Sequence, residues 1–282
     1  MTQSTRCPCC ALQECGPCLE GLVRCRACGH VRVSDNYSEA ELKQLYSENY
    51  FKGDGYPDYE CEENALRANF RRRVRDLAPL YAKGSRLFEI GCAYGYFLDE
   101  AQTHFSVVGC DICESAVKKA RERFGVDAQS LDFVNSPMEA NQFDVVCMWD
   151  TIEHLGAPEE FVRKAAHMLK SGGTLALSTG DIGSLNARIR GKNWRLISPP
   201  HHIHYFCASS VRALLERNGF HPPKVRYDAF WRSLGSSCRL ALGNPRTGML
   251  KTVYDLLTKS GLLNVSFPLN LFDLMTVYAV KR

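Results

Sequence analysis

Cysteines are concentrated at the start of the chain, at spacings that suit a metal ion. The chain has 14 cysteines, and seven of them fall within the first thirty residues. Cys7 and Cys10 form one C-x-x-C pair, and Cys25 and Cys28 form a second, with fourteen residues between the pairs. Four thiolates in this pattern close a tetrahedral zinc site that leaves no position for a substrate. We therefore predict a zinc-ribbon-like module over residues 1–33, with structural Zn²⁺ held by Cys7, Cys10, Cys25 and Cys28.

The same segment contains a third C-x-x-C pair, Cys15-Gly-Pro-Cys18. This pair competes with the other two as a ligand pair or, alternatively, forms a redox pair. A metal-free cysteine-rich tail is a further alternative, whereas a disulfide framework is disfavoured because nothing at the N-terminus resembles a secretory signal. A module this small lacks a core of its own, so we expect it to need the metal to fold. We expect His30 to be a bystander.

A glycine loop follows the first predicted strand of a larger domain. Leu87 to Ile90 form a short apolar strand that carries Glu89, and the loop Gly91–Gly95 leads into a helix from Tyr96. Strand, glycine loop and helix form the first unit of an open parallel α/β sheet, which binds ligands beyond the carboxyl ends of its strands. A dinucleotide fingerprint would need glycines at 91, 93 and 96. Ala93 and Tyr96 occupy two of these positions, so pyrophosphate binding is poorly supported.

The second predicted strand, residues 106–110, ends at an acid. Asp111 lies twenty residues beyond Gly91, where an acid in this topology accepts hydrogen bonds from ribose hydroxyls. A carboxylate suits a diol because its two oxygens can take both hydroxyls at once. An N-cap for the next helix, residues 114–124, is the alternative role. The third strand should lie within 126–133, where Asp132 would accept the adenine amino group and Phe133 would pack on the ring; a plain surface aspartate is the alternative.

More acid and histidine side chains follow the predicted fourth strand, residues 142–150. Glu153 and His154 come directly after it, and the carboxyl ends of parallel strands meet at one edge of a sheet, so both should lie near Gly91 and Asp111. A helix over 158–169 and a fifth strand over 174–178 continue the alternation. The segment after that strand, residues 183–208, carries three histidines beside a Pro-Pro turn: His201, His202 and His204. We expect this segment to be a loop over the substrate.

Four segments, in order and correctly spaced, resemble class I S-adenosylmethionine (SAM) methyltransferases. They are FEIGCAYG at 88–95, the strand-terminal Asp111, FDVVCMWDTIEHL at 143–155 and LKSGGTLALST at 169–179. The Trp-Asp-x-x-Glu-His form resembles the group near the ubiquinone O-methyltransferases. The cysteine pairs and residues 46–51 resemble bacterial members that modify sugars or secondary metabolites. The resemblance implies a doubly wound, Rossmann-like α/β fold with a seven-stranded, mostly parallel sheet whose last strand, 274–280, is antiparallel.

The resemblance also implies a cofactor and site residues. SAM would contact residues along the loop and the strand ends: Glu89, Gly91, Cys92, Ala93, Gly95, Tyr96, Asp111, Ile112, Asp132, Phe133, Trp149 and Asp150. Methyl transfer to a hydroxyl needs an aligned nucleophile whose proton is removed, and histidine is the usual base near neutral pH. The candidate catalytic residues are Glu153, His154, His202 and His204. The alternative for His204 and Tyr205 is that they satisfy buried backbone groups and fix the loop.

A catalytic metal is a further hypothesis for this edge of the sheet. Asp150, Glu153 and His154, with one loop histidine, would bind a divalent ion that orients a diol or a ribose terminus. The resemblance permits this, because ubiquinone O-methyltransferases and small-RNA terminal 2′-O-methyltransferases use a Glu-x-x-Glu-His cluster in this way. Here Asp150 replaces the first glutamate, which shortens one ligand.

Three functions follow from these features. A methyltransferase for a small-molecule acceptor is the first: a sugar, lipid-linked or secondary-metabolite hydroxyl, or a carbon atom. An RNA methyltransferase is the second, with the cysteine module and an arginine-rich helix over 62–80 as its RNA contacts; a solvated helix face is the alternative for those arginines. The third is a non-catalytic scaffold, against which the intact Glu89, Gly91, Gly95 and Asp111 count.

Composition narrows the class of protein. The 282 residues are 45% hydrophobic and 23% charged, as in an ordinary globular protein. A formal net charge of +4 is too mild to indicate a nucleic-acid binder. We expect a cytoplasmic protein without a membrane span. The predicted organisation is the module over 1–33, a helical cap over 34–84, and a SAM-binding domain over 85–282 with an insertion at 233–265. The apolar helix face of the insertion would serve core packing or a dimer; a lid over an apolar acceptor or contact with a membrane surface is the alternative.

Overall fold

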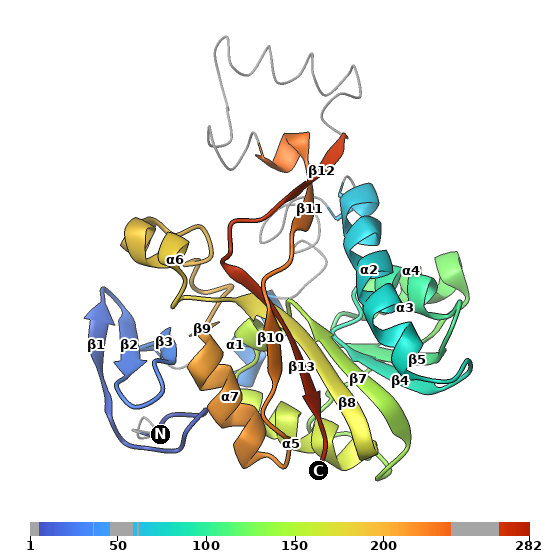
Figure 1. The fold of residues 1–282 in the computed structure, drawn as a ribbon, viewed down its shortest axis with the longest axis horizontal. Coiled ribbons are helices and arrows are strands. Elements are labelled where there is room, and N and C mark those ends of the chain that lie inside the picture. The colour runs from blue at the N-terminus through green and yellow to red at the C-terminus, as the bar shows by residue number, and fades with distance from the viewer. Residues whose placement is uncertain (1–5, 36, 46–58, 61, 238–264) are drawn as a thin grey trace.

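A seven-stranded sheet places the strand ends from which the predicted site residues follow. The computed structural model describes residues 6–35, 37–45, 59–60, 62–237 and 265–282 (Figure 1). The sheet has the order β10-β13-β8-β7-β4-β5-β6. Its strands are β4 (Arg86–Ile90), β5 (Ser106–Asp111), β6 (Asp127–Ser130), β7 (Phe143–Trp149), β8 (Leu169–Gly180), β10 (Lys224–Arg226) and β13 (Leu274–Val280). Only β13 within this sheet runs antiparallel to its neighbours. The predicted doubly wound sheet is confirmed.

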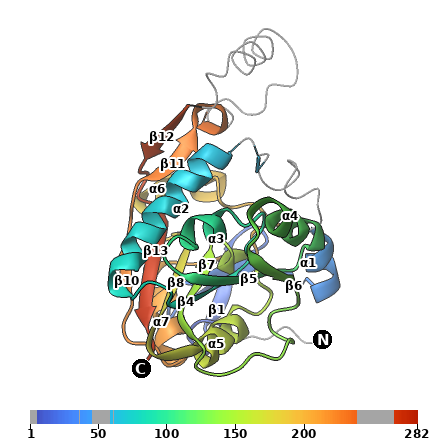
Figure 2. The same ribbon diagram turned by 90° about the vertical axis from the view of Figure 1, so that its right-hand side faces the viewer.

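Helices cover both faces of this sheet, because its central strands are apolar on both sides. On one face α2 (Glu63–Leu77), α3 (Tyr96–Ala101) and part of α4 (Glu114–Phe124) pack against Leu87, Val145 and Cys147. On the other face α5 (Pro158–Met168) and α7 (Ala208–Arg217) pack against Phe88, Val146 and neighbouring side chains. Figure 2 shows α2 lying alongside α3 on the first face. The strand ends are therefore fixed from both sides.

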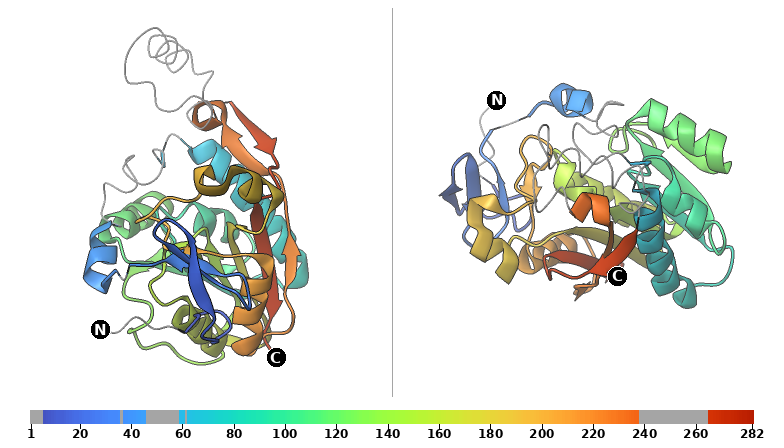
Figure 3. Two further views of the ribbon diagram at one scale, coloured as in Figure 1. Left: turned by 90° about the vertical axis from the view of Figure 1, so that its left-hand side faces the viewer. Right: turned by 90° about the horizontal axis from the view of Figure 1, so that it is seen from above.

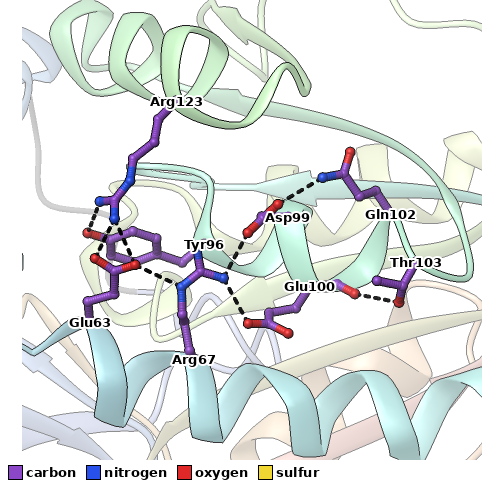
Figure 4. Close-up of polar contacts among 8 residues, drawn as sticks. All are labelled: Glu63, Arg67, Tyr96, Asp99, Glu100, Gln102, Thr103 and Arg123. Atoms are coloured by element: carbon purple, nitrogen blue, oxygen red, sulfur yellow. Dashed lines mark hydrogen bonds and ion pairs between the residues drawn. The ribbon is translucent and has the colours of Figure 1, made fainter.

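Arginines join the three helices of the first face (Figure 4). Arg67 of α2 contacts Glu63 on its own helix and Asp99 and Glu100 at α3, each at 2.8 Å. Arg123 of α4 contacts Glu63 at 2.7 Å and donates to the Tyr96 hydroxyl at 3.2 Å. We call these residues the arginine clasp. Through the clasp, the arginine-rich helix α2 forms ion pairs with both α3 and α4.

A second, smaller sheet contains the cysteines. It has the order β1-β2-β3-β9, from β1 (Cys15–Leu19), β2 (Leu22–Cys25), β3 (Val31–Val33) and the distant β9 (His204–Tyr205). Figure 3 shows these strands beside the main sheet. The last strand comes from the predicted substrate loop, which the sequence pattern does not reveal. The cysteine module, residues 6–33, is thereby joined to that loop by main-chain pairing.

Several predicted boundaries differ from those of the structure. Residues 170–173, which precede the fifth strand predicted over 174–178, lie within β8, next to an irregularity in its pairing with β7. Lys224–Arg226 forms β10 of the main sheet, whereas Phe230–Ser233 pairs separately as β11 with β12 (Ser266–Leu269). The helix predicted over 62–80 ends at Leu77 and continues as a 3-10 turn, Ala78–Leu80. Before α1 (Glu39–Leu45), Ser38 N–H donates to the Glu41 carboxylate at 2.7 Å and Glu41 N–H donates to Ser38 Oγ at 3.2 Å, which is a capping box.

Two expectations fall outside the described residues. They are the motif at 46–51 and the apolar helix expected around 250–262. Among the residues that the structure describes, no helix is long and apolar enough to cross a membrane.

Candidate functional site

The glycine loop lies where β4 ends and is held by the end of β5. Gly91 N–H donates to the Cys110 carbonyl at 2.8 Å, and Gly91 has a φ of +78°. A Cβ at Gly91 would lie 2.7 Å from Thr151 Oγ1, and one at Gly95 would lie 2.7 Å from Ala120 Cβ. Side chains are therefore excluded from both glycine positions. Ala93 between them has a φ of +47°, which L-residues seldom adopt.

Asp111 connects this loop to the following helix. Its Oδ2 accepts from Ala93 N–H at 2.9 Å and its Oδ1 accepts from Cys113 N–H at 2.9 Å. Burial raises the pKa of the Asp111 carboxyl above its usual value, while these backbone donors oppose that shift. Both roles expected for Asp111 remain compatible, because each carboxylate oxygen can accept more than one hydrogen bond. The next residue, Ile112, is exposed directly after the end of β5, where its apolar side chain is free to contact an aromatic ring of a ligand.

A buried arginine reaches this edge from α2, which the sequence analysis did not single out. Arg73 ion-pairs with Asp150 at 3.2 Å, donates to Ser178 Oγ at 2.9 Å, and places its guanidinium 4.4 Å from the centre of the Trp149 ring. Arg73 Nε, Glu89 Oε2 and Trp149 Nε1 are buried polar atoms without a hydrogen-bond partner. Burial raises the pKa of the Glu89 carboxyl well above its usual value, and the charge of Arg73 opposes this. A zwitterionic amino acid would satisfy such a pair of groups.

Four predicted cofactor residues lie in other surroundings. The Phe133 ring stacks on Phe161 with centroids 5.4 Å apart, inside the core below the sheet, and not as an open face for adenine. The Asp132 carboxylate accepts from the backbone of Val134 and from the Asn135 side chain, so it closes a local turn. Tyr96 stacks on Tyr59 and belongs to the arginine clasp. Cys92 is buried against Leu98 and Val117, and burial raises the pKa of its thiol.

Glu153, His154 and His202 come together at the carboxyl edge of β7. Ligand atoms of these three residues lie within 4.8 Å of one another. Glu153 and His154 belong to a 3-10 turn, Ile152–His154, directly after β7, whereas His202 comes from the loop after α6 (Leu185–Arg190). The His154 and His202 rings meet edge to face, with centroids 4.8 Å apart. We call this group the Glu–His–His cluster. Sequence spacing placed Glu153 and His154 together, and folding added His202.

Backbone carbonyls fix the tautomers of both imidazoles. His154 Nδ1 donates to the His201 carbonyl at 2.8 Å, and His202 Nδ1 donates to the Leu196 carbonyl at 2.7 Å. Because a carbonyl only accepts, each ring carries its lone pair on Nε2. Burial lowers the pKa of each of these histidines to about 4, so both are neutral at pH 7. Burial raises the pKa of Glu153 to about 7. The cluster can therefore accept a proton or bind a divalent ion.

Two other predicted members of this site face elsewhere. Asp150, with a φ of +50°, accepts from Ser178 Oγ at 2.8 Å and pairs with Arg73, so it belongs with the cofactor side rather than with the Glu–His–His cluster. The His204 ring is buried and hydrogen-bonded to His30 at 3.0 Å. That contact fits the alternative in which His204 fixes the loop. Tyr205 also acts within the loop, because its hydroxyl donates to the His202 carbonyl at 2.8 Å.

The four predicted zinc ligands converge. Cys7, Cys10, Cys25 and Cys28 place their sulfurs within 4.8 Å of one another. The Cys7–Cys28 and Cys10–Cys25 sulfurs are each 3.5 Å apart. A tetrahedron with Zn–S bonds of about 2.3 Å has edges of roughly 3.8 Å, so the cluster has the size of a zinc site. The residues thus fit the expected metal.

The third cysteine pair takes a different position. Cys15 and Cys18 both lie in β1, where Cys15 pairs with Cys25. Residues three apart in an extended strand are separated by about 10 Å, beyond the Cα distance that a disulfide spans. The redox-pair alternative does not fit this geometry. Neither residue belongs to the four-sulfur group.

Comparisons with known proteins agree with this arrangement. The model of a methyltransferase-domain family matches residues 62–223, more than half of the chain. The ubiquinone biosynthesis O-methyltransferase of Caulobacter vibrioides is 35% identical over 126 residues, which cover 42% of this chain and 48% of that protein. The enzyme of the same name from Roseobacter denitrificans is 33% identical over 112 residues, covering 37% of this chain and 45% of that protein. The chain matches about half the length of these curated relatives.

Solved structures share the fold. A SAM-dependent methyltransferase from Archaeoglobus fulgidus superposes with a TM-score of 0.53 at 19% identity, covering 76% of this chain and 94% of that one. Geranyl diphosphate C-methyltransferase from Streptomyces coelicolor has a TM-score of 0.54 at 12% identity, covering 78% and 80%. The matched region includes α2, the glycine loop, Asp111 and the Glu–His–His cluster. The chain belongs to the class I SAM-dependent methyltransferase family.

Proposed function

We propose that this chain transfers a methyl group from SAM to a hydroxyl of a small-molecule acceptor. The observation that carries the proposal is the Glu–His–His cluster, which lies beside the glycine loop. Thr151, the residue that a Cβ on Gly91 would strike, is only two positions before Glu153. A cofactor on the loop and an acceptor on the cluster would therefore be neighbours, as an in-line displacement requires.

The cofactor side fits the charges of SAM. The methionine part of SAM carries an ammonium and a carboxylate, and we assign Glu89 to the former and Arg73 to the latter. The partnerless Glu89 Oε2 and Arg73 Nε support this assignment, because buried polar atoms normally have partners. Asp111 would accept from the ribose hydroxyls and the exposed Ile112 would contact the adenine ring. Bound SAM would supply the electrophilic methyl group.

The acceptor side fits a hydroxyl nucleophile. A divalent ion held by Glu153, His154 and His202 would lower the pKa of a bound hydroxyl. Without an ion, neutral His202 or His154 would take the proton as a general base. The donor set, one carboxylate and two imidazoles with fixed tautomers, supports the first route. The names of the curated relatives, ubiquinone biosynthesis O-methyltransferases, support oxygen as the methylated atom.

The RNA alternative has weaker support. Of the arginines on α2, Arg67 belongs to the clasp, Arg73 is buried, and Arg72 donates to the Ala229 carbonyl. Because these three guanidinium groups already contact other parts of the protein, they do not form an exposed row that could bind RNA phosphates. The formal net charge of +4 points the same way.

Calorimetry with S-adenosylhomocysteine, the spent cofactor, tests the proposal. We expect binding by the intact chain and at least a tenfold loss of affinity for Asp111→Asn, because the ribose loses a charged acceptor. Asp127→Asn, an exposed acid at the start of β6, is the matched control and should bind normally. No binding by the intact chain would favour the scaffold. Salt-dependent retention on an RNA column would favour the RNA enzyme.

A further inference from the structure

We propose that the cysteine module, when loaded with its metal, positions the acceptor side of the site. The element it holds is the histidine loop, residues 195–207, which carries His202. The inference rests on the proposed function for the roles of His202 and Glu153. It assigns to the module a task within the reaction, in addition to its own folding: metal loading would control the acceptor half of the site and leave the cofactor half intact.

A chain of main-chain hydrogen bonds runs from the module to Glu153. Val33 N–H donates to the Ile203 carbonyl at 3.0 Å, and Ile203 N–H donates to the Glu153 carbonyl at 3.0 Å. Antiparallel pairing of Val31 with Tyr205 continues this contact into β9. Ile203 thus forms backbone hydrogen bonds both to β3 and to the turn that bears Glu153. Its neighbour in sequence is His202, so both sides of the Glu–His–His cluster depend on where β9 lies.

Buried side chains reinforce the same contact. His30 Nε2 and His204 Nδ1 are 3.0 Å apart, and the two rings stack with centroids separated by 5.1 Å. Phe206 packs against His30 at 4.8 Å. His30 and His204 are 1% and 6% exposed, so water does not replace either partner. His30 follows Cys28 by two residues, which places this packing directly after a predicted zinc ligand.

The cysteine cluster itself contacts the end of the loop. The Cys28 carbonyl accepts from Ser209 Oγ at 2.8 Å and from Cys207 Sγ at 3.3 Å. At the far end of α7, Arg217 donates to the Cys9 carbonyl at 2.9 Å. The backbone next to the predicted metal ligands therefore contacts α7 at both of its ends, and at its first end it also contacts the last residue of the histidine loop, Cys207.

The metal matters because the module has no separate core: its apolar side chains Leu22, Val31 and Val33 pack in one cluster with Ile203 and Tyr205. Its strands have five, four and three residues, and its four predicted ligand sulfurs lie within 4.8 Å of one another. Segments of this size usually unfold without metal. An unfolded module would leave β9 without its partner strand. The cofactor loop is held independently, through Gly91 to Cys110 and Ala93 to Asp111.

Hydrogen exchange on the metal-depleted protein tests the inference. The reference is protein treated with a weak chelator, which empties only the Glu–His–His cluster. Dialysis against a strong zinc chelator should then remove one further metal per chain, from the cysteine module. We expect amide exchange in residues 201–206 to rise at least tenfold, while the affinity for S-adenosylhomocysteine changes less than twofold. Unchanged exchange in this segment would overturn the inference, and so would a simultaneous loss of cofactor binding, because the module would then support the whole domain.

A variant separates the contact from the metal. Val33→Pro removes the N–H that bonds Ile203, whereas the matched control Val33→Ala shortens the same side chain and keeps the N–H. We expect faster exchange at 201–206 and at least tenfold weaker Mn²⁺ binding for Val33→Pro alone, with normal cofactor binding in both. If Val33→Pro also loses the metal of the module, its amide exchange at 201–206 and its affinity for S-adenosylhomocysteine should equal those of the metal-depleted protein. Equal behaviour of the two variants would overturn the inference.

These readouts distinguish the two proposals. If the intact chain binds neither S-adenosylhomocysteine nor Mn²⁺, the proposed function fails, whereas the exchange result still reports on the module and the loop. If the intact chain binds both ligands and the loop exchange does not respond to metal removal, only the further inference fails.

Discussion

At the scale of single residues, the site combines positions that exclude side chains with positions that supply charge. Gly91 is fixed both by its φ of +78° and by Thr151, and Asp111 is fixed by two backbone donors. Arg73 was the residue that pattern reasoning missed. Within the run of arginines at 67–75 nothing in the sequence marks one of them as buried, although a helical period places Phe70, Arg73, Val74 and Leu77 on the inner side.

Substitution at Gly91 should separate backbone strain from lost binding. We expect Gly91→Ala to weaken S-adenosylhomocysteine binding at least tenfold, because the new Cβ would displace Thr151 and deform the loop. Gly125→Ala is the matched control: its φ is +64°, but nothing lies within 4 Å of the added Cβ. Each substitution should cost about 1–2 kcal/mol from the left-handed backbone. Calorimetry and urea unfolding measure the two effects, and equal cofactor affinities would contradict this account.

Glu153 should make stability depend on pH. Its pKa is raised to about 7 by burial, against an ordinary value of 4.5. Relative to an unfolded chain, this shift favours folding below pH 4.5, and the benefit is lost as pH rises through 7. Glu153→Gln, which mimics the protonated form, should therefore match the parent near pH 5 and melt several degrees higher near pH 8.

Thermal unfolding in the presence of a weak chelator, so that the Glu–His–His cluster stays metal-free, checks this expectation. His154 and His202 titrate in both proteins, so their opposite contribution between pH 4 and 6.5 largely cancels in the comparison. Glu139→Gln, at an exposed position, is the control: the difference between its melting temperature and that of the parent should not change with pH. A gap between parent and Glu153→Gln that does not change from pH 5 to pH 8 would contradict the raised pKa.

At the scale of elements, the parallel strands and their helices followed from the sequence. The helix over Glu114–Phe124 and the strand over Leu274–Val280 have the predicted bounds, because alternation, apolar runs and glycine stops are local signals. The arginine-rich helix was different. Its interpretation as a solvated face or an RNA contact missed the clasp, because Glu63, Asp99, Glu100 and Arg123 meet Arg67 only after α2 has packed on α3 and α4.

The clasp should contribute measurably to stability. Arg67 is largely buried at its head group and bonds three carboxylates, so Arg67→Met would leave Asp99 and Glu100 beside each other without their shared cation. We expect a loss of about 1–3 kcal/mol in the free energy of unfolding, measured in urea. Arg71→Met, on the exposed side of the same helix, is the matched control and should change stability by less than about 0.5 kcal/mol. Equal losses for both would rule out a specific role of the clasp.

At the level of the whole molecule, the sheet of the cysteine module contains one strand, β9, that comes from the histidine loop of the larger domain. The main sheet presents the glycine loop, Asp111 and Glu153 at one edge, and the cysteine module reaches the same region through β9. Sequence division at residue 33 separates the module from the larger domain, yet the small sheet is completed by His204–Tyr205. A short polar strand of two residues has no pattern that predicts its partner.

Local sequence patterns were enough to predict the α/β fold, the cofactor loop and the four converging cysteines. Each depends on local spacing: a glycine loop after an apolar strand, an acid twenty residues on, and two C-x-x-C pairs. Which distant side chains complete the site became visible only in the packed fold. It brought Arg73 to Glu89 and Asp150, selected His202 over His204 as the partner of Glu153 and His154, and placed His204 against His30. The reason is physical: these contacts join segments up to 174 residues apart, and packing of helices and loops, not local propensity, sets their geometry.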